Sequence, residues 1–225
     1  MPRIEPATER LIGRPRLLRL LADVEGDHRR ANDLFAWNVA AAGAAMEAVH
    51  VFELILRNAL DRELRVWNAN MNGDPDWLLT PHEFLHKSLR PADRAAALQR
   101  ARRIAAERGR PVRHDDVLAQ LSLGTWRYLL PSRSVKAKQR LWDAALSHAF
   151  PAWPGDWGPE SVVTRVASAH ELRNRVAHLE PLQHLDLRRV RRDMRSVCHA
   201  IGPDAARFFV QAERLIPIIE TNPIA

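Results

Sequence analysis

One stretch of the chain limits the fold more than any other: residues 29–68 contain no proline and are rich in alanine, leucine, glutamate and arginine. Apolar residues recur through it at the three- and four-residue spacing of one helix face. Proline inside a helix removes a hydrogen bond and clashes with the preceding turn, so its absence leaves a continuous helix open. The stretch therefore predicts one long helix, and Gly43 marks the place where it could kink.

Shorter helices are predicted for the rest of the chain. A turn rich in Asn, Asp and Gly at residues 70–76 ends the long helix, and a proline-rich loop occupies residues 151–159. Further helices are predicted at residues 91–108, 114–130, 134–149, 159–179, 186–201 and 203–216. No segment alternates apolar and polar residues as a half-buried strand does. We therefore expect an all-α fold, with a single helical domain at residues 29–225 and an N-terminal extension at residues 1–28.

Composition indicates the class of protein and its cellular compartment, but it does not identify the function. The apolar fraction of 46% is ordinary for a globular protein, and charged residues interrupt the apolar runs. We expect no membrane segment and, because the first residues lack the apolar core of a secretion signal, a cytoplasmic location. The single Cys198 excludes an internal disulfide. A net charge of +7 favours an anionic partner, although an arginine-rich composition also arises from GC-rich coding.

The helix expected at residues 159–179 carries polar groups on an apolar face. At 100° per residue, one face holds Val162, Val166, Ala169, Arg173 and Val176. A guanidinium cannot lose its proton to escape burial, so Arg173 needs a carboxylate, a cavity or a subunit interface. An adjacent ridge holds His170, Asn174 and His178 at four-residue spacing.

These side chains suit phosphodiester chemistry. Histidine moves protons near neutral pH, arginine holds phosphate and its developing charge, and asparagine orients either group. In RNA the 2′-OH supplies the nucleophile, so we expect neither a metal nor a cofactor, and the sequence offers no convincing set of metal ligands. Spacing alone also fits arginine and histidine side chains that are merely solvated or structurally satisfied.

The segment from Glu171 to Leu182 contains the pattern Arg-Asn-x-x-x-His, formed by Arg173, Asn174 and His178. It resembles the ribonuclease motif of HEPN proteins, in particular the Abi-like (abortive infection) branch. Residues 52–61 and 121–126 resemble two further segments of that branch.

This resemblance implies a HEPN-like helical bundle that forms a homodimer in which the two motif helices face each other. Arg173 and His178 would take the catalytic positions of a composite, metal-independent RNA-cleaving site, and Asn174 the polar second position. The implied function is an endoribonuclease of an abortive-infection or toxin-type antiviral defence system. Its partner would be RNA, with an antitoxin or a non-coding RNA as a possible further partner.

The long helix offers supporting residues. Glu53 falls within or beside its apolar arc, and a buried carboxylate needs compensation. We hypothesise that Glu53 pairs with Arg173 or orients a motif histidine, that Arg57 helps to bind phosphate, and that His170 supports the site. The alternative is that Glu53 pairs with a neighbouring arginine at the bundle surface, where such pairs contribute little.

Four more cations are candidates for RNA binding: Arg127, Arg175, Arg188 and Arg191. Residues 121–126, before Arg127, could stack an unpaired base, but such a segment is more often a helix junction with a core tryptophan. Arg188 and Arg191 belong to a basic run, which by default is a solvated helix face. His114 lies near a turn, and we expect an ordinary surface role for it.

Three functions remain open from the sequence. The first is the endoribonuclease. The second is a catalytically inactive RNA-binding or regulatory HEPN module that uses the same basic surface. The third is an interaction protein whose motif holds a dimer or a nucleotide.

Overall fold

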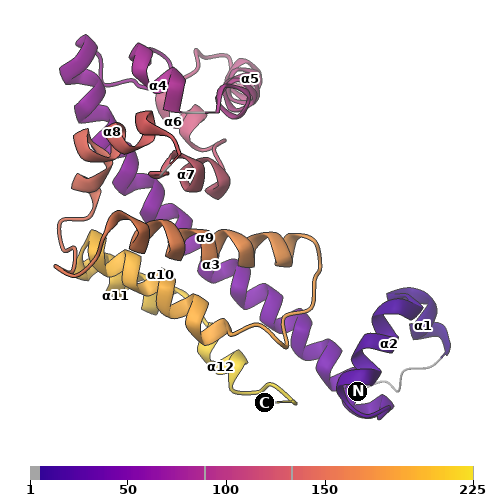
Figure 1. The fold of residues 1–225 in the computed structure, drawn as a ribbon. Coiled ribbons are helices and arrows are strands. Elements are labelled where there is room, and N and C mark those ends of the chain that lie inside the picture. Colours follow the sequence, from indigo (N-terminus) through magenta and orange to yellow (C-terminus); the bar gives the residue numbers. More distant parts are fainter. Residues whose placement is uncertain (1–5, 89, 133, 225) are drawn as a thin grey trace.

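The computed structural model describes residues 6–88, 90–132 and 134–224, and no strand occurs within them. The chain is therefore all-α, as the sequence predicts (Figure 1). In chain order the helices are α1 (Pro6–Ile12), α2 (Arg14–Asp23), α3 (His28–Asn72), α4 (Glu83–Ser88), α5 (Pro91–Glu107), α6 (His114–Leu118), α7 (Leu123–Leu129), α8 (Lys136–Ala144), the 3-10 helix η1 (Leu146–Ala149), α9 (Pro159–Ala177), α10 (Leu187–Ile201), α11 (Pro203–Ala212) and α12 (Leu215–Ile219).

The long helix is confirmed as α3, which has 45 residues and crosses the whole molecule (Figure 1). Its first turn is capped by the carboxylate of Asp27, which accepts the backbone N–H groups of Arg29 and Arg30 at 2.8 and 3.1 Å. It ends at Gly73, whose φ of 80° lies in the left-handed region that glycine adopts without a Cβ penalty. The helix thus runs four residues beyond the predicted end at residue 68, to Asn72, and it continues without a break through Gly43.

Two groups of helices pack along α3. Helices α9 to α12 all contact it and lie beside its middle portion, with α10 packed between α9 and α11 (Figure 1). Helices α4 to α8 gather around its C-terminal portion, whereas α1 and α2 lie at its N-terminal end (Figure 1). The central position of α3 explains how Glu53 and Arg57, in mid-helix, come close to the motif helix α9.

A single hydrophobic cluster runs through the molecule. From α3 it takes fully buried residues that include Phe52, Leu56, Leu60 and Leu64, each with 0% exposure. Burial of one such side chain stabilises the fold by about 1.5–3 kcal/mol. Leu20 and Val24 belong to the same cluster, so the boundary predicted at residue 28 is not a break in packing.

By length and composition, α3 could cross a membrane, contrary to the expectation that no segment qualifies. Central helices of soluble proteins meet the same criterion when their apolar face is buried by neighbouring helices. Contacts of α3 with α2, α7, α9, α10, α11 and α12 bury such a face here, which makes it the core helix of the bundle.

Several predicted helices are divided in the structure. The helix predicted at residues 114–130 is wrong as one element, because α6 and α7 are separated at Ser122, whose backbone is extended. The segments predicted at 134–149 and 203–216 likewise each contain two helices. Apolar periodicity continues through these breaks since the helices on both sides face the same core. Helices α1, α2 and α4 were not predicted.

Candidate functional site

The motif helix α9 presents the expected apolar face to the core. It starts at Pro159, where the missing backbone N–H costs nothing, and buries Val162, Val166, Ala169 and Val176. Arg173 lies on this face but is only half-buried. The apolar arc therefore ends in a charged group that keeps access to the surface.

His178 lies directly after the last helical residue of α9 and is exposed. The chain turns there through a Schellman motif, in which the N–H of Leu179 bonds to the carbonyl of Val176 and the N–H of Glu180 bonds to that of Arg175. Leu179 has a φ of 56°, which is strained for a residue with a branched side chain. Within the described residues the His178 side chain has no hydrogen bond or ion pair, so its imidazole is free for a ligand.

A chain of polar contacts connects the motif helix to α7. Arg127 Nη1 donates to His170 Nδ1 at 2.7 Å, and the amide nitrogen of Asn174 lies 3.4 Å from the same atom. Asn174 Oδ1 in turn accepts from Arg173 Nη1 at 3.3 Å. The structure thus brings together four of the residues singled out in the sequence: Arg127, His170, Arg173 and Asn174.

His170 is a neutral imidazole with a defined tautomer. Since a guanidinium can only donate, Nδ1 of His170 must accept, and the ring proton therefore resides on Nε2. Burial, together with the positive charges of Arg127, Arg173 and Arg90, lowers the pKa of His170. With 9% exposure it holds Arg127 in place and is itself poorly accessible to a substrate.

Glu53 on α3 lies near enough to Arg173 for their charges to interact, but no ion pair or hydrogen bond joins the two side chains among the described residues. Burial raises the pKa of Glu53, and the charges of Arg57 and Arg173 and the N–H of Leu123 oppose that rise. Nε of Arg57 is buried without a hydrogen-bond partner in the described residues. The single carboxylate of Glu53 therefore lies near two guanidinium groups, those of Arg57 and Arg173. One of these two positive charges is not neutralised by Glu53.

A groove of about 490 Å³ opens beside this cluster, between α9 and α10. Arg127 and Asn174 line it together with Thr164, Ser168, Glu171, Asp186 and Arg189. We call it the α9–α10 groove. The groove exposes Arg127 and Asn174, two members of the polar chain around His170, to solvent. An extended polar ligand can lie in it.

The other predicted RNA-binding arginines are engaged in ion pairs. Arg191 bonds through Nε and Nη2 to Glu213 at 2.6 Å, and the Glu213 side chain is 2% exposed, so this cation is part of the fold. Arg175 lies 3.5 Å from Glu180 and Arg188 lies 3.8 Å from Glu220, both in exposed pairs. The structure therefore does not bring Arg188 and Arg191 into the cluster around His170.

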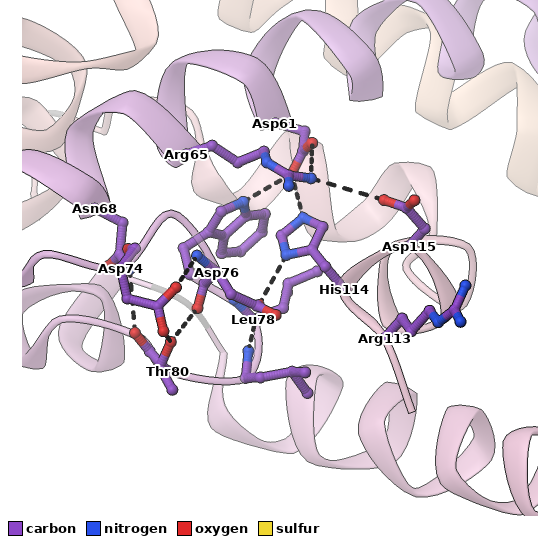
Figure 2. Close-up of polar contacts among 12 residues, drawn as sticks. Asp61, Arg65, Asn68, Asp74, Asp76, Leu78, Thr80, Arg113, His114 and Asp115 are labelled. Carbon is purple, nitrogen blue, oxygen red and sulfur yellow. Dashed lines mark hydrogen bonds and ion pairs between the residues drawn. The ribbon is translucent and has the colours of Figure 1, made fainter. Parts of the chain in front are cut away.

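A buried polar cluster surrounds His114, which the sequence does not predict, and the surface role expected for this residue is wrong. His114 is 7% exposed, and its Nε2 and Nδ1 each lie 2.8 Å from a carboxylate oxygen, of Asp61 and Asp76 respectively (Figure 2). The indole of Trp77 donates to the same Asp61 oxygen at 2.8 Å. Both ring nitrogens must carry protons to serve both carboxylates, so His114 is an imidazolium.

This cluster joins α3, the loop after it and α6 (Figure 2). Burial opposes the charge of His114, but hydrogen bonds and charges of Asp61 and Asp76 outweigh it and raise the pKa. A substrate cannot reach groups this deeply buried, so the cluster has a structural role. Among the described residues no group of three or more His, Cys, Asp and Glu side chains is arranged to hold a metal ion.

Comparisons with protein-family models, with curated proteins and with solved structures give no match to this chain. The fold and the site together define an all-α protein that carries a polar cluster on helix α9. The cluster consists of an arginine, an asparagine and a histidine.

Proposed function

We propose that this protein is a metal-independent endoribonuclease whose site centres on Arg173 and His178. The observation that carries the proposal is the polar chain from Arg127 through His170 and Asn174 to Arg173, on the helix that ends at the exposed His178. Such an arrangement is suited to holding a phosphodiester and moving a proton next to it. The resemblance of residues 171–182 to the Abi-like HEPN motif supports the same assignment and suggests a cytoplasmic antiviral-defence or toxin role.

The proposed reaction is transfer of the phosphodiester to the neighbouring 2′-OH. His178 removes the proton from the 2′-OH, whose oxygen then attacks the phosphorus while the bond to the 5′-oxygen breaks. Arg173 neutralises charge that develops on the non-bridging oxygens, and the leaving oxygen takes its proton from a second histidine, which a second copy of the chain would supply. The products are a 2′,3′-cyclic phosphate and a 5′-hydroxyl end.

A second copy of the chain would complete this chemistry. The reaction has two proton transfers, whereas His170 is occupied by Arg127 and leaves His178 as the accessible imidazole of the motif helix. The residues directly after it line a small, mostly apolar hollow. Its lining comprises Leu20, Phe35, Val39, Ala42, Val176, Leu179 and Pro181, with Arg16, Asn38 and Glu180 as the polar members. Val39 and Leu179 are 59% and 67% exposed, and exposed apolar side chains of this kind favour an interface. A homodimer closed there would place two copies of His178 near one another.

Cleavage of RNA in EDTA tests the proposal. Purified wild-type protein should cut total RNA or tRNA in EDTA, and His178→Ala should lose on the order of 10²-fold or more in rate, as expected for general acid–base catalysis. Arg173→Ala should lose a similar factor. His50→Ala and Arg103→Ala alter exposed residues outside the site and should cut at the wild-type rate.

A binding module without catalysis is the second candidate. The observation that favours it is the occupied acceptor atom of His170, which leaves the inner part of the cluster able to hold a phosphate but unable to accept a proton there. In that case wild-type protein would bind RNA in a salt-dependent manner through Arg127 and Arg173 and leave it intact. If wild-type protein neither cuts nor binds RNA, both functions are excluded for the isolated chain.

A further inference from the structure

A second pocket borders Arg127 in addition to the α9–α10 groove. It has a volume of about 390 Å³ and opens between the end of α7, the start of α8 and the start of α9. Its polar lining comprises Arg127, Tyr128, Ser132, Lys138, Gln139 and Glu160. We call it the Lys138 pocket. It shares Arg127 and Ala167 with the groove, so the two hollows adjoin.

Positive charge is concentrated at this pocket. The guanidinium carbon of Arg90 lies 3.6 Å above the centre of the Tyr128 ring, and that of Arg127 lies 5.2 Å from it. Both guanidinium groups thus contact the same tyrosine ring, and a cation–π contact does not neutralise the charge of either arginine. Glu160 is the carboxylate of the lining, and it is engaged in an interaction of its own. Among the described residues, Arg90, Arg127 and Lys138 thus stand against one carboxylate, a local excess of two positive charges.

Lys138 is the least compensated of these cations. It is half-buried, and the described residues give it no ion pair or hydrogen bond. Burial, and next the nearby charge of Arg90, lower the pKa of Lys138. A cation held in a partly desolvated place among like charges is unfavourable unless an anion joins it. The pocket therefore has the electrostatic character of an anion-binding site.

We propose that the Lys138 pocket binds the phosphomonoester group of a nucleotide. A phosphomonoester carries about −1.5 to −2 charges at pH 7, which matches the local excess better than the single charge of a phosphodiester does. Arg127 offers a planar fork and Lys138 a point charge to the phosphate oxygens. Ser132 and Gln139 line the same pocket and can bond to sugar hydroxyl groups. A free nucleotide and the 5′-phosphate end of an RNA chain both carry this group.

Calorimetric titration with 5′-AMP and with adenosine tests the pocket without requiring any cleavage, so it can fail or succeed independently of the endoribonuclease proposal. Wild-type protein should bind 5′-AMP at least tenfold more tightly than adenosine. Lys138→Ala should weaken 5′-AMP binding roughly tenfold, as expected for loss of a charge-assisted hydrogen bond. The matched control is Lys136→Ala, which removes an exposed lysine from the same helix and should bind within about twofold of wild type.

Lys138→Arg keeps the charge and should retain most of the binding, which separates loss of the anion site from a folding defect. Titration of His178→Ala protein with a short RNA carrying either a 5′-phosphate or a 5′-hydroxyl end then identifies the source of the group. Tighter binding of the 5′-phosphorylated RNA than of the 5′-hydroxyl RNA assigns the pocket to RNA ends, and equal binding of the two RNAs assigns it to free nucleotides. Equal binding of 5′-AMP and adenosine, or equal binding of 5′-AMP by the Lys138→Ala and Lys136→Ala proteins, would overturn the proposal.

Discussion

At the residue scale, His170 and His178 lie on the same helix and differ in what they can do. His170 is buried and accepts a hydrogen bond from Arg127, so it positions a cation. His178 is exposed where the helix ends, with both ring nitrogens open to a ligand. The sequence places both on one ridge, but only the structure distinguishes the positioning histidine from the accessible one.

His114 gives a pH-dependent prediction for stability. Its folded pKa is raised above the ordinary value of about 6.5, so its charge stabilises the fold fully below that value. The contribution is lost as the pH rises through the folded pKa. His114→Gln keeps hydrogen-bonding groups but cannot carry charge. At pH 6 we expect its free energy of unfolding to be about 2 kcal/mol below that of wild type, by analogy with hydrogen bonds to charged groups.

Urea unfolding between pH 5 and pH 9 measures this difference. It should shrink as the pH rises, whereas His50→Gln, at an exposed position without such partners, should differ little from wild type throughout. A His114→Gln deficit that stays constant, or that grows toward pH 9, would show that the charge of His114 does not stabilise the cluster.

Leu179 gives a second residue-scale prediction. Its left-handed backbone costs a non-glycine residue about 1–2 kcal/mol, and its side chain is 67% exposed. Leu179→Gly should therefore raise the free energy of unfolding, by about 0.5–1 kcal/mol after the entropy of glycine in the unfolded chain is subtracted. Thermal or urea unfolding checks this. The strained backbone of Leu179 lies next to His178. An RNA cleavage assay on the variant therefore shows whether this backbone conformation also holds His178 in position.

At the element scale, the long helix could be predicted because its determinants are local. A proline-free stretch with helical periodicity, ended by a glycine, needs no information from elsewhere in the chain. The division between α6 and α7 depends instead on tertiary packing, because Leu121, Leu123 and Trp126 all face the core across the break. The core position of Trp126 confirms the interpretation of residues 121–126 as a helix junction.

Alanine substitutions at two helical glycines should have opposite effects, one on stability and the other on cleavage. Gly43 is exposed in the middle of α3, and a Cβ there would contact nothing within 4 Å. Gly43→Ala should stabilise the protein by about 0.5–1 kcal/mol and leave cleavage unchanged. A Cβ at Gly124 would lie 3.2 Å from Nε2 of His170. Gly124→Ala should displace the imidazole and with it Arg127, and so reduce cleavage on the order of tenfold.

Unfolding and cleavage measured on both glycine variants separate these effects. Equal cleavage by the Gly124→Ala and Gly43→Ala proteins, with both folded, would mean that the position of His170 does not matter for activity.

At the scale of the whole molecule, the site joins residues that are distant in the sequence. Arg127 and His170 are 43 residues apart, and His114 and Asp61 are 53 apart. Local periodicity carries no information about such pairs, which is why the His114 cluster was missed. A carboxylate on an apolar arc needs a cation, which predicts Arg173 as a partner of Glu53. In the structure the charge of Arg173 acts on Glu53, but no ion pair joins them among the described residues.

The proposed homodimer gives a prediction at this scale. Val39 lines the apolar hollow beside His178 and is 59% exposed, whereas Val66 is 55% exposed on another part of the same helix. Val39→Arg should abolish the dimer and cleavage, because it places a charge in an apolar interface, and Val66→Arg should preserve both. Analytical ultracentrifugation and an RNA cleavage assay measure the two properties. A Val39→Arg protein that is still dimeric would place the interface elsewhere, and a monomeric protein that still cuts would refute the composite site.

If Arg173 and His178 promote attack by the 2′-OH on the neighbouring phosphodiester, the product ends must carry the groups that this reaction leaves. An end-labelled RNA is incubated with wild-type, Arg173→Ala or His178→Ala protein in EDTA, and the new ends are identified by mass spectrometry. We predict 2′,3′-cyclic phosphate and 5′-hydroxyl ends from wild-type protein and none from the two variants. Products with 5′-phosphate ends, or cleavage that the variants retain, would contradict the account.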